Sequence, residues 1–244
     1  MIFPVGDDNT GRLRTPLITY LLIAVNVLVF VFLQGLGENE RFTYAFSTVP
    51  QEIRTGTDVA QPVRVELGDE SATIPLQPTP GSVYLTLLVS MFMHGSLMHL
   101  LGNMLFLWIF GDNVEDDLGP VRYTSFYLVT GIAAALAHVV STFVVGDNPF
   151  IPSLGASGAI SGVMGGYLVL HPHRRVRVII MRALTEVPAY VAVGLWFVFQ
   201  LISAFGVIGQ GPQAGGGVAF MAHIGGFIAG LVLVRLFKAG VRRP

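Results

Sequence analysis

The sequence predicts an all-α membrane protein, a bundle of six transmembrane helices with a polar insertion between the first two. Of its 244 residues, 52% are hydrophobic and only 12% are charged, about half the charged fraction of a typical soluble domain. The mean hydropathy is +0.66. Uncharged apolar runs of about 20 residues, the length that crosses a bilayer as a helix, recur along the chain.

The apolar runs predict six spans, at residues 17–33, 97–110, 123–145, 157–170, 187–208 and 218–237. They divide the chain into an N-terminal segment at 1–16, a six-helix domain at 17–238 and a tail at 239–244. No small-residue cleavage site follows the first run, so we expect a retained span and not a signal peptide.

Between the first two spans, residues 37–82 are too polar to cross a membrane and form the predicted insertion. Within it, residues 63–67 and 72–74 flank a Gly68-Asp69 turn signal and are predicted to pair as a hairpin. The apolar run 83–93 is too short to cross, so we expect an interfacial or re-entrant segment.

Basic residues divide unevenly between the two sides of this topology. Eleven lie on the side of both chain termini, and only Arg41, Arg54 and Arg64 lie on the other. Because cytoplasmic loops carry the excess of lysine and arginine, both termini are predicted to be cytoplasmic. The insertion and the loops 146–156 and 206–217 then face outside. We expect a multi-pass protein of the cell membrane, and the lack of a transit peptide favours a prokaryotic cytoplasmic membrane.

Composition also excludes several classes of function. The 14 basic and 15 acidic residues nearly cancel, so nothing indicates a nucleic-acid partner. The absence of cysteine removes disulfides, cysteine nucleophiles and thiolate metal sites. There is no His-Glu-x-x-His motif, and no Asp or Glu lies inside the six spans as drawn, which excludes zinc and aspartyl intramembrane proteases. We expect no metal and no cofactor.

Polar side chains within spans are costly and point to function by default. The informative ones are His94, His99, Asn103, Ser157 and His223. His99 and Asn103 are four residues apart and share one helix face, either as part of a site or as a pair bonded between helices. His94 either supports the same pocket, by positioning water for example, or is structural.

Ser157 opens an apolar run of 14 residues, which gives roughly 21 Å of helix. That length falls short of the hydrocarbon thickness, so the Ser157 end should stop below the outer surface. Irregular backbone at that depth needs a water-filled cavity or protein around it. Ser157 is therefore expected at a helix N-terminus in a wet pocket; the alternative is an ordinary N-cap serine.

His223 lies near the outer end of the last span, on a helix with a ridge of small residues. Such ridges let helix backbones approach closely. The two ridges are Ala222, Gly226 and Gly230 on the last span, and Gly158, Gly162 and Gly166 on the fourth. The alternative is that the two ridges serve packing alone. The same packing would bring Ser157 beside His223. A serine within reach of an imidazole is the minimum for nucleophilic catalysis, here as a dyad because no acid is available.

In these features the chain resembles the rhomboid intramembrane serine proteases. The resemblance covers residues 94–230 and rests on three motifs in the family's order: His94-x4-His99-x3-Asn103, Gly155-Ala-Ser157-Gly158 and Ala222-His223-Ile-Gly225-x4-Gly230.

The resemblance implies a rhomboid-type bundle in which Ser157 is the nucleophile and His223 the general base and acid. It implies an oxyanion site made by His99, Asn103 and the Ser157 amide. His94, Gly155 and Gly158 would support them. The family cuts transmembrane segments near the outer membrane face.

Two positions depart from the family pattern. Many relatives carry Trp-Arg in the loop before the first motif, where this chain has Leu85 and Thr86. Some have a tyrosine stacked on the base histidine, where this chain has Ser161. The second departure leaves open how His223 is held.

We therefore expect an intramembrane serine endopeptidase whose partners are transmembrane protein substrates and the lipid bilayer. One alternative is a catalytically silent relative that binds membrane clients, which would not need to keep Ser157 and His223. Another is a small transporter, which predicts paired repeats that the two halves of this chain lack.

Overall fold

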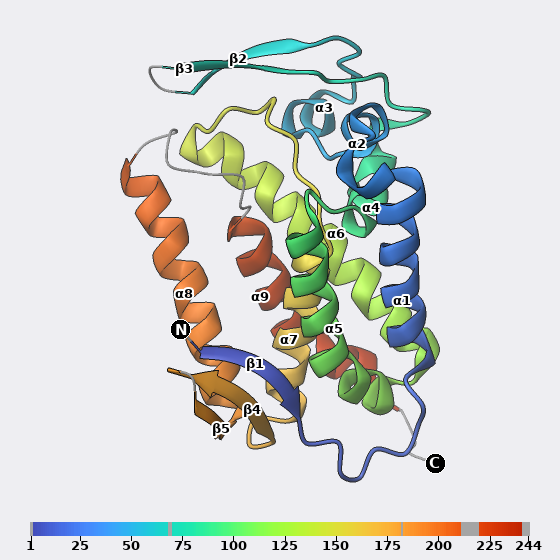
Figure 1. Cartoon of the computed structure of the whole chain (residues 1–244), viewed down its shortest axis with the longest axis vertical. Helices are drawn as coiled ribbons and strands as arrows, with labels where there is room; N and C mark the ends of the chain where they lie inside the picture. Colours follow the sequence, from blue (N-terminus) through green and yellow to red (C-terminus); the bar gives the residue numbers. More distant parts are fainter. Residues whose placement is uncertain (1, 68–69, 182, 211–219, 241–244) are drawn as a thin grey trace.

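The computed structural model describes residues 2–67, 70–181, 183–210 and 220–240, and a helix occupies each predicted span (Figure 1). The helices are α1 (Leu17–Leu28), which continues as the π-helical η1 (Val29–Leu33), α5 (Leu97–Leu118), α6 (Pro120–Val145), α7 (Ser157–Leu170), α8 (Ala189–Gln210) and α9 (Phe220–Lys238). In the described part of the chain, α5, α6 and α9 are long and apolar enough to cross a membrane.

Two predicted boundaries are wrong. α5 does not end at residue 110 but continues to Leu118, because the polar side chains of its last two turns are buried and paired. Residues 209 and 210, which the sequence analysis placed only in an outer loop, still belong to α8. The rest of that loop and the first two residues of the predicted last span lie outside the described residues.

The chain is mostly helical, as predicted, but two small sheets accompany the helices: the predicted hairpin and a second sheet that the sequence analysis missed. β1 (Ile2–Asp7), β4 (Arg175–Ile180) and β5 (Ala183–Pro188) form an antiparallel sheet in the order β1-β4-β5. The sequence signal for this sheet lies in β4, where Val176 and Val178 are buried and alternate with exposed arginines. Period-two alternation of this kind is typical of a half-buried strand.

The polar insertion contains α2 (Glu40–Phe46), α3 (Pro50–Thr55) and the predicted hairpin. Its strands β2 (Val63–Leu67) and β3 (Glu70–Ile74) pair antiparallel, with Val63 opposite Ile74, which confirms the pairing. The two turn residues lie outside the described residues. After the hairpin, the apolar run 83–93 forms three short helical segments, η3 (Val83–Leu85), α4 (Thr86–Val89) and η4 (Ser90–Phe92).

The short helix α7 lies at the centre of the bundle. Its residues 158–167 are all buried, and it packs against α5, α6 and α9. The β2–β3 hairpin lies at one end of the molecule, and β1 with β4 and β5 lies at the other (Figure 1). Ser157, the first residue of α7, faces the hairpin end.

At the opposite end, acidic side chains of α5 bind the start of the chain. Both Glu115 carboxylate oxygens accept main-chain N–H groups of α1, from Ile18 at 2.9 Å and Thr19 at 2.7 Å. Pro16, the N-cap residue of α1, makes no side-chain hydrogen bond to these N–H groups. Asp116 accepts the N–H groups of Leu13 and Arg14 in the same way. These bonds explain why the polar end of α5 is helical and buried.

Candidate active site

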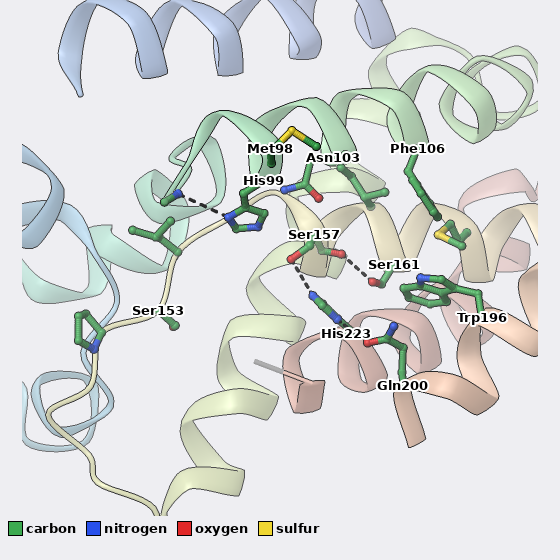
Figure 2. A pocket seen from close by; sticks show the side chains of 16 residues that line it. Met98, His99, Asn103, Phe106, Ser153, Ser157, Ser161, Trp196, Gln200 and His223 are labelled. Atoms are coloured by element: carbon green, nitrogen blue, oxygen red, sulfur yellow. Dashed lines mark hydrogen bonds between the residues drawn. The ribbon is translucent and has the colours of Figure 1, made fainter. Parts of the chain in front are cut away.

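Ser157 is the first residue of α7, but it does not cap the helix. The N-cap is Ala156, and no side chain caps this end. The Ser157 Oγ instead lies 2.8 Å from Nε2 of His223 on α9 (Figure 2). The alternative of an ordinary N-cap serine is therefore wrong, and the predicted pairing of the two side chains is present.

The small-residue ridges bring α7 and α9 together as predicted. A Cβ built on Gly226 would lie closer than 3.0 Å to the carbonyl oxygen of Gly158. One built on Gly230 would meet the carbonyl oxygen of Gly162 in the same way. The backbones of the two helices are thus in contact along this line, and only glycine fits there. This contact sets the distance between Ser157 and His223.

His223 is held by residues of α8 that the sequence analysis did not single out. Its Nδ1 lies 2.8 Å from Oε1 of Gln200, and its ring lies 6.2 Å from that of Trp196. Ser161, at the position of the family's stacking tyrosine, donates its hydroxyl to the Ser157 carbonyl oxygen at 2.6 Å. Gln200 could have been noticed as an uncharged polar residue inside an apolar span.

His99 and Asn103 line the same cavity as Ser157 and His223, a hollow of about 550 Å³. The Asn103 side-chain nitrogen is buried and has no hydrogen-bond partner among the described residues, so it is free to donate. The His99 Nδ1 accepts the Gly95 N–H at 3.4 Å, which leaves Nε2 to carry the proton. The Ser157 N–H, in the first turn of a helix, has no intrahelical acceptor.

Gly155 and Gly158 act through their backbones. Gly155 has φ +131°, and a Cβ there would lie 2.9 Å from the His99 ring. A Cβ on Gly158 would lie 2.6 Å from the Cβ of Ala134 on α6. Both glycines therefore let neighbouring groups approach closely, and their supporting role in the site stays a prediction.

His94 does not line the cavity. It is fully buried, and its ring lies edge-on to that of His99, with 5.1 Å between centroids. Gln34 at the end of η1 fixes its main chain, accepting the His94 N–H at 2.8 Å and donating to its carbonyl at 3.0 Å. Neither ring nitrogen has a partner among the described residues. His94 thus supports His99 by packing.

The cavity combines a polar centre with apolar walls. Met98, Phe106, Met164 and Trp196 contribute to the walls, and the loop 152–154 closes one side. A serine hydroxyl bonded to an imidazole, with unpaired donors around the same hollow, has the groups that an acyl-transfer site requires. In the part of the chain that the structure describes, no three His, Asp or Glu side chains gather as metal ligands would.

Comparisons with known proteins agree on one family. The family profile described as Rhomboid domain matches residues 81–239. The chain is 31% identical over 153 residues to Rhomboid protein 1, mitochondrial, of Saccharomyces cerevisiae, covering 61% of this chain and 40% of that protein. It is 33% identical over 99 residues to Presenilin-associated rhomboid-like protein, mitochondrial, of Homo sapiens, covering 41% and 26%.

A bacterial relative matches over a longer stretch. Rhomboid protease GluP of Bacillus subtilis is 29% identical over 225 residues, which is 92% of this chain and 36% of that protein. The chain thus spans 40% or less of the length of these three relatives. The match to the family profile includes every residue that the sequence analysis predicted for the site.

Proposed function

This chain belongs to the rhomboid family, a family of membrane proteins, and on that premise we propose that it is an intramembrane serine endopeptidase. The single observation that carries the proposal is the 2.8 Å contact between the Ser157 hydroxyl and His223 Nε2 inside the cavity. A protein that only binds membrane clients has no need of this geometry. The name of the bacterial relative, a rhomboid protease, supports the same function.

In the proposed reaction, His223 Nε2 takes the Ser157 hydroxyl proton as Oγ attacks a peptide carbonyl. The negative charge that develops on the carbonyl oxygen is stabilised by the Asn103 side-chain N–H, His99 and the Ser157 amide. His223 then returns its proton to the leaving amine, and an acyl-enzyme remains. Water hydrolyses this ester by the same proton transfers, which frees Ser157 and releases the second product.

We further propose that the six helices cross the cell membrane with both termini in the cytoplasm. The positions of β1 and the end of α9 support this arrangement, because both lie beside the polar end of α5. The substrates would be transmembrane segments cut near the outer face, since Ser157 lies at the end of a helix of only 14 residues. Two relatives bear the word mitochondrial in their names, so the membrane assignment also needs a test.

The test compares wild type with Ser157→Ala in liposomes that carry a single-span model substrate, and mass spectrometry locates the cut. Ser125→Ala is the matched control, the same change at an exposed serine of α6 outside the cavity, where the hydroxyl bonds only the Val121 carbonyl among the described contacts. We expect cleavage near the outer face by wild type and Ser125→Ala, and none by Ser157→Ala. No cleavage by folded wild type, with several substrates, would favour a client-binding protein. Fractionation of cells with tagged protein tests the membrane assignment.

A further inference from the structure

Gln200 lies in the apolar helix α8, where an amide needs a partner to offset its loss of water. Its side chain is only 6% exposed. Its Oε1 lies 2.8 Å from Nδ1 of His223, and Figure 2 shows the amide beside the imidazole, on the side away from Ser157. The glutamine therefore contacts the proposed base and not the nucleophile.

This contact determines which ring nitrogen of His223 carries the proton. A carbonyl oxygen can only accept, so the bond to Gln200 Oε1 requires a proton on Nδ1. In the neutral ring, Nε2 is then unprotonated and can accept the Ser157 hydroxyl proton. The opposite tautomer would direct an N–H at Ser157 and could not act as a base. The Gln200 contact thus selects the reactive tautomer.

We propose that Gln200 is the positioning residue for His223. Ser157, His223 and Gln200 then form a hydrogen-bonded triad, in which a neutral amide stands where soluble serine proteases have a carboxylate. The proposal rests on the proposed function of the dyad. When Ser157 transfers its proton, the ring becomes cationic, and its bond to Gln200 becomes charge-assisted and stronger. A buried carboxylate would supply more charge, but its own loss of water would be far more costly.

Gln200 and Trp196 together hold His223 in place of the tyrosine that stacks on the base histidine in some family members. Ser161 is turned to the Ser157 carbonyl and does not hold the base. Trp196 and Gln200 are four residues apart on α8 and therefore share one face. Trp196 lies against the ring of His223 while Gln200 bonds its edge. Two groups of α8 thus fix the orientation of the imidazole.

The test uses two replacements of similar length at residue 200. Gln200→Met removes the acceptor, and Gln200→Glu keeps an oxygen in its place. We expect Gln200→Met to lower kcat about 10- to 100-fold, the range of one hydrogen bond to a charged group, with KM within about twofold. Gln200→Glu should keep kcat within about fivefold of wild type. Ile202→Ala, a change on the exposed face of α8, should leave both constants unaltered.

A second measurement does not depend on turnover. Nitrogen NMR of histidine-labelled protein, with His223→Ala to assign the signal, reports which ring nitrogen is protonated. We expect Nδ1–H in wild type and a mixture of tautomers in Gln200→Met. An unchanged kcat and an unchanged tautomer in Gln200→Met would overturn the proposal. If wild type cleaves nothing but the tautomer still depends on Gln200, the positioning role stands and the proposed protease function fails.

Discussion

Gly226→Ala tests whether the contact between α7 and α9 sets the geometry of the site. Two effects oppose each other at this position. Alanine gains about 1 kcal/mol over glycine in a helix interior through its greater helix propensity. Against this, its Cβ would lie closer than 3.0 Å to the Gly158 carbonyl oxygen, a backbone atom that cannot rotate away. Overpacking of that kind costs typically about 1–3 kcal/mol.

The steric effect should therefore win, and we expect a net destabilisation of about 1 kcal/mol, or a fall in Tm of about 2–4 °C. The effect on activity should be larger. α9 can relieve the clash only by moving away from α7, and that movement lengthens the 2.8 Å contact between Ser157 and His223. A misplacement of about 1 Å lowers catalysis by about 10²-fold.

Gly194→Ala is the matched control. Gly194 also lies in an apolar helix, α8, but a Cβ there meets nothing within 4 Å. We expect this variant to be as stable as wild type or more so, with full activity. Thermal unfolding in detergent and cleavage of the single-span substrate measure both quantities. If Gly226→Ala were as stable and as active as Gly194→Ala, backbone contact between α7 and α9 could not be what aligns the dyad.

Three further outcomes are expected. Asn103→Ala should lower kcat about 10²-fold by removing one oxyanion donor, and kinetics with unaltered kcat would exclude that role. Gly155→Ala should be almost inactive, because a Cβ at φ +131° is strained and lies 2.9 Å from the His99 ring; full activity would contradict the steric argument. Burial raises the pKa of Asp7 from 3.8 to about 7, so the folded state favours the neutral carboxyl. Protonated Asp7 therefore contributes its full stability below about pH 4, and this contribution is lost as the pH rises through about 7. Asp7→Asn should therefore have a higher Tm than wild type at pH 8, with a difference that shrinks toward pH 4, and an equal Tm at pH 8 would refute this.

The sequence predicted the features that depend on local pattern. Long apolar runs gave the helices, and the alternating strands with a Gly-Asp turn signal gave the hairpin. The pairing of Ser157 with His223 could also be predicted, because the glycines at spacing four that bring their helices together are visible in the sequence. These are properties of a single helix face or of one short segment.

The features that were missed depend on partners distant in the chain. The strand at β1 exists only because β4 provides its hydrogen bonds, about 170 residues later, with Ile2 opposite Ile180. The last turns of α5 have the polar sequence of a loop, and they are helical and buried because the N-terminal segment packs over them. Gln200 has no motif around it, and its role depends on where α8 lies relative to α9. Tertiary contacts decide all three: a polar residue in an apolar span can be noticed from the sequence, but no local pattern gives its partner.

The bonds between Glu115 and the start of α1 have a consequence for how the protein is made. α1 leaves the ribosome 97 residues before the carboxylate that accepts the Ile18 N–H. Until then the N–H groups of its first turn lack these acceptors and must be hydrated, because an unpaired N–H group is costly to bury away from water. The final packing of α1 therefore has to wait for the synthesis of α5, so the order of these two helices in the chain is not the order in which they reach their final contacts.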